Sequence, residues 1–225
     1  MIKPFVMYDS VPNLIEPTTL TVDLEKLINN INGINQAVGY DPEVCLTSTG
    51  RKSSISLTHP KVIPQKMIDR YGEFKSKFIG PITDGEYILK MNYNISTADF
   101  TEMHQMVRNS YVKTAMDQIQ SYHLSRFGKG KVKWIQSASL GPGGGFCLHK
   151  DVHCEIRYHV VLQTNNYCYT MVLENDEIKV VHMPADGRVW LLNTNVLHNA
   201  VNYTNDELNP LSVRTHLIFT VYNES

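Results

Sequence analysis

From residue 131 onward the sequence alternates between short segments rich in β-branched and aromatic residues and clusters of turn-forming residues. The turn clusters lie at residues 142–145, 164–166, 174–176 and 184–187. Seven or eight short strands at this spacing are typical of a β-sandwich or a double-sheet jelly roll. The expected strands are 132–140, 154–162, 168–173, 178–183, 188–192, 198–203 and 213–222. The sequence therefore predicts a mainly β fold with accessory helices.

The region before residue 131 has a mixed and partly helical pattern. Thr21 is expected to cap a helix that ends at Gly39. The apolar stripe of this helix is Leu24, Leu27, Ile28, Ile31 and Ile34. We expect residues 1–130 to pack on a core formed by residues 131–225, so that the chain forms one compact domain.

A second, longer helix is expected to start at Asp99, with Glu102 three residues later completing a capping box. Its apolar stripe would be Phe100, Met103, Val107, Tyr111, Ala115, Ile119 and Tyr122. The polar segment 47–56, which contains a glycine, is expected to be a loop. Within it we interpret Arg51 and Lys52 as a solvated surface pair in preference to a contact with a substrate carboxylate.

Composition limits the kinds of partner that the chain can have. The net charge of the 225 residues is −1, so neither nucleic acid nor an anionic membrane is an expected partner. No run approaches the roughly 20 apolar residues of a membrane span, and residues 1–13 lack an apolar segment of secretory type. The four cysteines include no CxxC pair, which favours reduced thiols and a cytoplasmic location. The sequence does not indicate the oligomeric state.

One stretch of the chain has an alternation that bears on function. Its odd positions are His149, Asp151, His153, Glu155, Arg157 and His159, and its even positions are apolar except for a lysine. Alternate residues of a β-strand point to the same face. An extended conformation would therefore gather imidazoles, carboxylates and a guanidinium on one face, as in a metal centre with charged neighbours.

The pair His149-x-Asp151 has the spacing of two ligands on one strand face, and His198 after a later strand is the candidate third ligand. Two histidines and one carboxylate form the facial triad of non-haem Fe(II) oxygenases. The alternative is a surface or packing histidine beside an unrelated aspartate. The Gly-rich run 141–145 lets the backbone turn sharply into such a site. Arg214, on the last strand, can grip a ligand carboxylate or form a structural ion pair.

Four motifs occur in order between residues 140 and 222, namely LGPGGGFCLHKD, RYHVVLQTN, HMPADGRVWLLNTNVLHNAVNYTND and RTHLIF. Together they resemble the aspartyl/asparaginyl β-hydroxylase family of 2-oxoglutarate- and Fe(II)-dependent oxygenases. The resemblance implies a double-stranded β-helix, which is a cupin-like jelly roll, with accessory helices from the N-terminal part. It also implies Fe(II), 2-oxoglutarate as cosubstrate, and O2.

The same resemblance implies a role for each matched residue. The iron ligands would be His149, Asp151 and His198. Arg214 would anchor the distal carboxylate of 2-oxoglutarate. Arg157 and His159 match the Arg-x-His pair that lines the cosubstrate and substrate pocket.

The sequence departs from the family pattern in two places. Asp151 supplies a carboxylate ligand that the vertebrate aspartyl hydroxylases lack, which places the chain nearer the bacterial and phage-like members. Residues 206–210 lengthen the gap between His198 and Arg214, and we expect them to form a loop before the last strand.

A rival ligand pair, His153-x-Glu155, stands on the same expected strand face. We prefer His149 and Asp151 because they directly follow the Gly-rich turn. His153 and Glu155 would then support the ligands or face the substrate.

The resulting functional expectation is a dioxygenase that hydroxylates a C–H bond of an amino-acid, peptide or other small-molecule substrate and releases succinate and CO2. The alternative is a non-catalytic, cupin-like module for metal binding or interaction, because folds of this kind host unrelated functions. Metal-assisted hydrolysis with zinc in the same site is a third possibility. The sequence does not identify the substrate.

Overall fold

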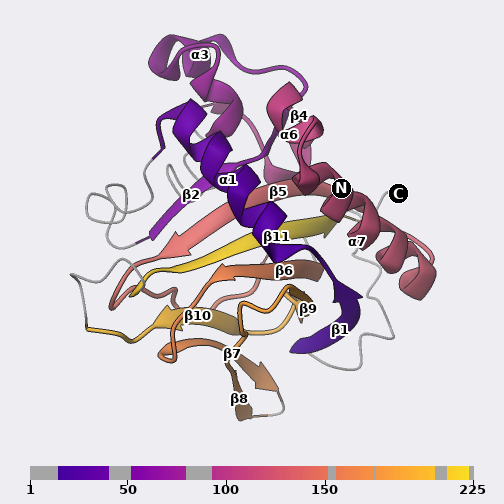
Figure 1. Ribbon diagram of the computed structural model, residues 1–225, viewed down its shortest axis with the longest axis vertical. Helices are drawn as coiled ribbons and strands as arrows, with labels where there is room; N and C mark the ends of the chain where they lie inside the picture. The colour runs from indigo at the N-terminus through magenta and orange to yellow at the C-terminus, as the bar shows by residue number, and fades with distance from the viewer. Residues whose placement is uncertain are drawn as a thin grey trace.

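Two antiparallel sheets form the centre of the molecule in the computed structural model, which describes residues 15–40, 52–79, 93–151, 156–174, 176–205 and 212–222 (Figure 1). The larger sheet contains β1 (Ile15–Thr21), β2 (Lys52–Ser56), β5 (Lys131–Leu140), β6 (Ile156–Gln163), β9 (Arg188–Asn193) and β11 (Arg214–Tyr222). Its strand order is β1-β9-β6-β11-β5-β2. The smaller sheet contains β7 (Cys168–Glu174), β8 (Glu177–Val181) and β10 (His198–Asn202), in the order β10-β7-β8.

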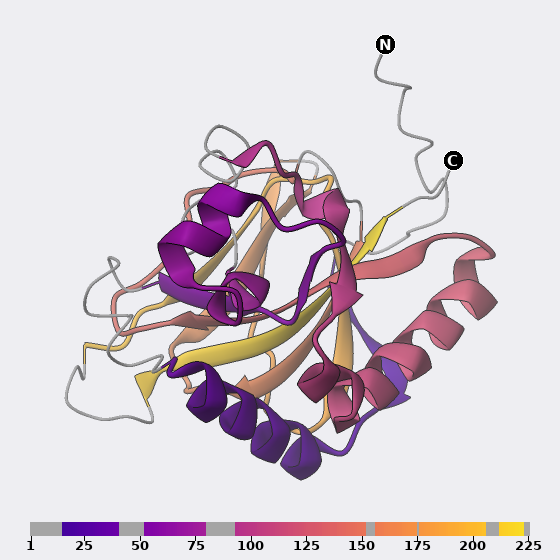
Figure 2. The same cartoon turned by 90° about the horizontal axis from the view of Figure 1, so that it is seen from above.

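The remaining elements come from the N-terminal part of the chain. A short antiparallel pair joins β3 (Thr58–Pro60) to β4 (Phe100–Met103). The helices are α1 (Leu24–Val38), α3 (Gln65–Tyr71), α6 (Gln105–Arg108) and α7 (Tyr111–Phe127), with single 3₁₀ turns at Lys75–Phe78 and Thr97–Asp99. Figure 2 shows α1 and α7 on the same side of the larger sheet. No helix in the described part of the chain is long and apolar enough to cross a membrane.

Alternation along the central strands separates a packing face from a functional face. On β6, Ile156, Tyr158 and Val160 are fully buried in the core that the sheet shares with α1 and α7. Burial of each such side chain contributes about 1.5–3 kcal/mol. The residues between them, Arg157 and His159, line a cavity on the opposite face of the sheet. Strand periodicity therefore decides which side chains can meet a ligand.

The smaller sheet covers this functional face, so the two sheets face each other as in a jelly roll. Thr170 on β7 and His198 on β10 line the same cavity as the inward residues of the larger sheet. The expected mainly β fold of jelly-roll type with accessory helices is confirmed. The predicted strands between residues 131 and 222 are present, with ends that differ by no more than two residues where both ends are described.

The N-terminal part also contributes to the larger sheet itself. β1 pairs with β9 at one edge, and β2 pairs with β5 at the other edge. α1 and α7 of this part share a hydrophobic core with the larger sheet. The division of the chain at residue 130 stays a prediction.

The first helix begins two residues later than predicted. Its N-cap is Asp23, whose Oδ1 accepts a hydrogen bond of 3.1 Å from the backbone N–H of Lys26. Thr21 instead ends β1, where it pairs with Arg188. The predicted end is correct, because Gly39 adopts the left-handed conformation (φ 67°) that suits a C-cap.

The predicted start of the long helix at Asp99 was wrong, whereas its second half, which contains Ala115 and Ile119, is helical as predicted. Residues 100–103 form β4, and the long helix begins only after Ser110, whose side chain accepts from the backbone N–H of Val112. Asp99 caps a local turn, since its Oδ2 accepts from the backbone N–H of Ser96 at 2.8 Å. The fully buried Phe100 packs in a cluster with Trp134, and this tertiary contact overrides the helical spacing.

The loop predicted over 47–56 was also wrong for its second half. Residues 52–56 form β2, whereas residues 47–51 lie outside the described part of the chain. Three of the five residues of β2 are serines, so the sequence of this segment does not show the alternation of apolar and polar residues that predicts a strand. Ser53, Ser54 and Ser56 are nevertheless buried, because β2 pairs along its whole length with β5.

Candidate metal centre and ligand cavity

A cavity of about 400 Å³ lies between the two sheets. Its charged and imidazole-bearing residues are Lys52, His149, Asp151, Arg157, His159, His198, Arg214 and His216. Three of these are cationic and one is a carboxylate, so the described residues give the cavity an excess of positive charge. Its aromatic and aliphatic walls include Trp134, Phe146 and Leu192. This combination of apolar walls and a few convergent polar groups is typical of a small-molecule site.

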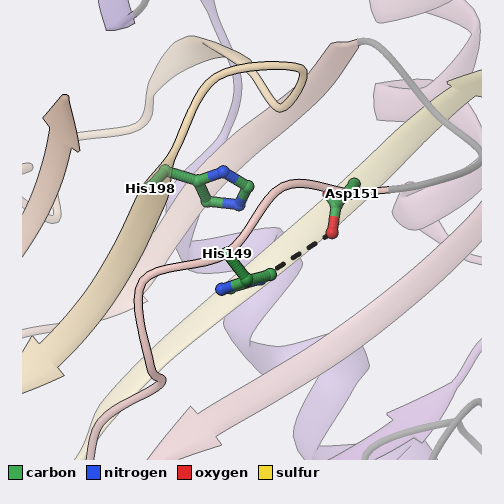
Figure 3. A group of neighbouring side chains, drawn as sticks. All are labelled: His149, Asp151 and His198. Carbon is green, nitrogen blue, oxygen red and sulfur yellow. Dashed lines mark ion pairs between the residues drawn. The ribbon is translucent and has the colours of Figure 1, made fainter. Parts of the chain in front are cut away.

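Three potential metal ligands converge in this cavity (Figure 3). His149 and Asp151 lie in the segment between β5 and β6, and His198 is the first residue of β10. One donor atom from each of the three side chains lies within 4.8 Å of the other two. The sequence prediction that these three residues come together is therefore consistent with the structure.

Backbone hydrogen bonds bring the two histidines together. The N–H of His149 donates to the carbonyl of His198 at 3.0 Å, and the N–H of His198 donates to the carbonyl of His149 at 2.9 Å. The N–H of Asp151 donates to the carbonyl of Thr194 at 3.0 Å. These contacts attach the ligand segment to β10 and to the turn before it, and the two imidazole ring centroids lie 4.5 Å apart.

Both histidines have one ring nitrogen committed to the backbone. Nδ1 of His149 lies 2.7 Å from the carbonyl oxygen of Cys147, and Nδ1 of His198 lies 2.9 Å from that of Val196. A carbonyl oxygen only accepts, so each Nδ1 carries the proton and each Nε2 keeps its lone pair. This is the tautomer that a metal ligand needs, and such backbone contacts orient metal-binding imidazoles.

The environment of His198 also favours the ligating form. Burial lowers the pKa of His198, against the opposing effects of the hydrogen bond with Val196 and the charge of Asp151. Its imidazole is therefore held neutral at physiological pH, which is the form that binds metals.

The two carboxylate oxygens of Asp151 have different neighbours. Oδ2 lies 3.0 Å from Nη2 of Arg157, and Oδ1 lies 3.8 Å from Nε2 of His149. The guanidinium of Arg157 also lies over the ring of Trp134, 5.4 Å from its centroid. Arg157 thus holds the carboxylate with Oδ1 on the side of the histidines. Two imidazole nitrogens and this oxygen fit a divalent ion that prefers mixed nitrogen and oxygen ligands.

Arg214 places a cation deep in the same cavity. Its side chain is 95% buried, with Nη2 donating to Thr170 Oγ1 at 2.7 Å and Nε donating to Nε2 of His216 at 3.0 Å. Burial lowers the pKa of Arg214 to about 10. No carboxylate in the described part of the chain pairs with it. A buried charge without a counter-ion is costly, so this site is suited to an anionic ligand.

His159 is connected to Arg214 through His216, which contacts both residues. Its Nδ1 lies 3.2 Å from Nδ1 of His216, and its Nε2 is buried with no hydrogen-bond partner in the part of the chain that the structure describes. Burial is the main cause that lowers the pKa of both imidazoles well below the usual value. The predicted cavity residues Arg157, His159 and Arg214 thus all lie in one site.

A model of the aspartyl/asparaginyl beta-hydroxylase family matches residues 101–224 of the chain. The chain belongs to this family. The match covers β5 to β11, with the three candidate ligands and Arg214 inside it. Family membership agrees with the resemblance carried by the four sequence motifs. A search of curated proteins gave no match.

Solved structures that match the chain at low sequence identity include the following three proteins. An oxidoreductase of the 2OG-Fe(II) oxygenase family from Burkholderia pseudomallei shares 15% identity, over 54% of this chain and 60% of that protein, with a TM-score of 0.42. A Pseudomonas putida prolyl-4-hydroxylase shares 16% identity over 49% and 62%, with a TM-score of 0.38. HygX from Streptomyces hygroscopicus, solved with nickel and 2-oxoglutarate bound, shares 11% identity over 42% and 57%, with a TM-score of 0.34. The chain thus spans less than two thirds of each of these proteins.

One sequence expectation about this hydroxylase-family site needs correction. The stretch 149–159 is not one continuous strand, because β6 begins at Ile156 and His149 is held by an isolated bridge to His198. The rival pair His153 and Glu155 lies outside the described residues. Among the described residues of this stretch, strand periodicity holds for Arg157 and His159, which share the cavity face of β6.

The sequence reasoning missed several residues that line the cavity, namely Trp134, Gln136, Thr170 and His216. Trp134 and Gln136 stand at alternate positions of a predicted strand, and His216 stands two residues after Arg214 on another. The period of two could therefore have placed these three on the functional face. Lys52, interpreted as a solvated residue, also lines the cavity, with Nζ 4.6 Å from the centroid of the Phe146 ring.

Proposed function

We propose that this chain is a 2-oxoglutarate- and Fe(II)-dependent dioxygenase that hydroxylates a C–H bond of an amino-acid, peptide or other small-molecule substrate. One observation carries the proposal: the cavity that brings together His149, Asp151 and His198 also contains the buried guanidinium of Arg214, which has no counter-ion among the described residues. The first group is suited to a metal and the second to an anion, which together match a metal-chelating dicarboxylate.

His149 and His198 would hold the ferrous ion through Nε2, and Asp151 would hold it through Oδ1. Two imidazoles and one carboxylate form the donor set of non-haem Fe(II) oxygenases. When bound, Fe(II) would activate O2 and 2-oxoglutarate would supply two electrons, so that one oxygen atom enters succinate with release of CO2 and the other converts C–H to C–OH. Arg157 would keep Oδ1 available by holding Oδ2.

Arg214 would bind the distal carboxylate of 2-oxoglutarate with its guanidinium, assisted by the hydroxyl of Thr170. Charge-assisted hydrogen bonds of this kind are among the strongest in proteins. His159 and Arg157 line the space between this anchor and the metal ligands. Because these side chains are largely buried, a bound ligand would displace water from them, which strengthens every electrostatic contact in the site.

The substrate would occupy the part of the cavity lined by Trp134, Gln136 and Lys52. Apolar and hydrogen-bonding groups both occur there, which suits an amino acid or a peptide side chain. We also propose a cytoplasmic setting, because Cys147 and Cys168 are free thiols.

The test is succinate release from 2-oxoglutarate with Fe(II), measured against a panel of free amino acids and peptides. We expect the wild type to release succinate in step with hydroxylation of one panel member. His149→Ala, Asp151→Ala and His198→Ala should each abolish release. Wild-type release by the His198→Ala protein would contradict the ligand assignment.

The same assay separates the competing functions. A non-catalytic cupin-like module would bind metal but release no succinate with any panel member. A zinc hydrolase would be active with Zn²⁺ and would not require 2-oxoglutarate. We expect zinc to occupy the site and inhibit succinate release.

A further inference from the structure

Three buried side chains form a continuous hydrogen-bonded row on neighbouring strands. Nε of Arg214 donates to Nε2 of His216 at 3.0 Å, and Nδ1 of His216 lies 3.2 Å from Nδ1 of His159. Arg214, His216 and His159 are all more than nine-tenths buried and all line the ligand cavity. His216 is the middle member. It touches Arg214, the proposed anchor, and His159, which lines the space between this anchor and the metal ligands.

The chemistry of the first contact fixes the protons along this row. The Nε–H of an arginine only donates, so Nε2 of His216 must accept and carries no proton. A neutral imidazole then has its proton on Nδ1, which donates to Nδ1 of His159. Nδ1 of His159 therefore carries no proton, and the proton of its ring is on Nε2.

The alternative arrangements of protons are unfavourable at this place. Burial, followed by the charge of Arg214, lowers the pKa of His216 well below the usual value. Burial, followed by the charges of Arg157 and Arg214, does the same for His159. Both rings are therefore neutral. If Nδ1 of His159 donated the hydrogen bond instead, both ring nitrogens of His216 would have to accept, and His216 would carry no ring proton.

The row ends in a donor that the described residues do not use. Nε2 of His159 is buried and has no hydrogen-bond partner. A buried N–H without an acceptor costs about 1–3 kcal/mol. The cavity therefore offers a ligand two kinds of donor, the guanidinium of Arg214 and the N–H of His159.

We propose that His216 is a positioning residue that orients Arg214 and fixes the tautomer of His159, so that both present donors to one anionic, oxygen-rich ligand. In its simplest form this ligand is the dicarboxylate cosubstrate, and this part of the inference rests on the proposed function. The tautomers themselves do not depend on it. His216 acts through its two neighbours and is not itself assigned a contact with the ligand.

Two substitutions of His216 separate polarity from packing. His216→Gln keeps an acceptor for Arg214 and a donor for His159, because a glutamine amide has one oxygen and an NH2 group. His216→Leu fills the space but provides neither. Thr215→Val is the matched control on the same strand. It removes a hydroxyl that is hydrogen-bonded to Ser139, and Thr215 itself does not line the cavity.

The first measurement is the tautomer of each histidine in the metal-free protein, read from long-range proton–nitrogen NMR spectra with ring-labelled histidine at mildly alkaline pH. We expect His216 to be protonated on Nδ1 and His159 on Nε2 in the wild type. Protonation of His216 on Nε2 would overturn the inference. This measurement needs neither a variant nor any bound ligand.

The second measurement is the dissociation constant of 2-oxoglutarate for the zinc-loaded chain, obtained by calorimetry. We expect His216→Leu to raise it about tenfold or more, His216→Gln to stay within about threefold, and Thr215→Val to match the wild type. Zinc affinity should be unchanged in all three. Equal loss of 2-oxoglutarate binding in the Gln and Leu variants would overturn the role of polarity.

These outcomes also distinguish the inference from the proposed function. If the wild type binds zinc but not 2-oxoglutarate, the proposed function fails, while the NMR spectra still decide whether His216 sets the tautomers. If 2-oxoglutarate binds and His216→Leu binds it as tightly as the wild type, the proposed function survives and the inference fails.

Discussion

Arg157 and Asp151 are joined by a contact of 3.0 Å between Nη2 and Oδ2. Asp151 precedes β6 and Arg157 lies within it, so the contact links the ligand segment to the central sheet. It leaves Oδ1 as the oxygen nearer to His149. The proposed metal site would therefore be oriented by a residue that does not itself touch the metal.

We predict that Arg157→Gln weakens metal binding by about 10- to 100-fold, which is the usual effect of removing a group that orients a metal ligand. Anaerobic calorimetry with Fe(II) measures this directly. Arg188→Gln is a matched control, because Arg188 makes a more exposed ion pair with Asp186 away from the cavity. Equal metal affinity in the Arg157→Gln protein and the wild type would show that the contact is not needed.

Replacing the buried arginine should separate ligand binding from stability. We predict that Arg214→Met raises the concentration of 2-oxoglutarate required for turnover by roughly 100-fold, because two charge-assisted hydrogen bonds are lost. The free energy of unfolding in urea should not fall, since the variant removes a buried charge that no carboxylate of the described segments neutralises. A large loss of stability with an unchanged 2-oxoglutarate requirement would assign Arg214 a structural role instead.

Acid should destabilise the fold through His123, which is fully buried and bonded through Nδ1 to the hydroxyl of Tyr158 at 2.9 Å. Burial is the main cause that lowers the pKa of His123 from 6.5 to about 4. The unfolded chain therefore takes up a proton at higher pH than the folded one. The stability due to neutral His123 is fully present above about pH 6.5 and is lost as the pH falls towards 4.

The expected loss from this group is on the order of 2–3 kcal/mol. Urea unfolding at several pH values between neutrality and about pH 4 measures it. We predict a flatter pH dependence for His123→Gln, with a remaining slope due to the buried His159 and His216. An identical slope in variant and wild type would contradict a neutral His123 in the folded state.

Asn202 should be a structural support for the ligand anchor. Its fully buried side-chain NH2 donates to the carbonyls of Leu140 at 3.1 Å and Ser212 at 2.6 Å, which joins the end of β5 to the segment just before Arg214. Asn202→Ala leaves both carbonyls without this donor. We predict a loss of about 2–4 kcal/mol in urea unfolding, together with weaker 2-oxoglutarate binding.

Asn202→Asp provides a sharper comparison, because it keeps the shape but replaces the donor by an acceptor. It should be at least as destabilising as the alanine variant. If the aspartate variant is as stable as the wild type, the two donated hydrogen bonds are not what holds this junction together.

Where period-two alternation coincided with burial, the sequence was sufficient to predict the structure. Leu217 and Phe219 on β11 and Tyr158 on β6 read as strand residues and are buried as such. The convergence of His149, Asp151 and His198 was also predictable, because the spacing of the first two and the position of His198 after a strand are local features. Arg214 was identified for the same reason. The role of the two histidines and the aspartate as metal ligands stays a prediction.

The remaining features depend on contacts that are distant in sequence. β2 is a strand because it pairs with β5, and its serines gave no sign of this. β4 replaced the start of a helix because Phe100 packs against Trp134. The positions of His216 and Gln136 in the cavity follow from the pairing of β11 and β5 with their neighbours. None of these pairings is encoded in a short window of residues.

The central claim is that His149, Asp151 and His198 hold a ferrous ion beside an anchor for 2-oxoglutarate. The most direct measurement is an anaerobic titration of the metal-free protein with Fe(II) and then 2-oxoglutarate, followed by visible absorption. We expect a weak charge-transfer band that saturates at one equivalent of iron, is absent with Zn²⁺, and is lost in His198→Ala. A band of unchanged strength in His198→Ala, or no band in the wild type with both components bound, would contradict it.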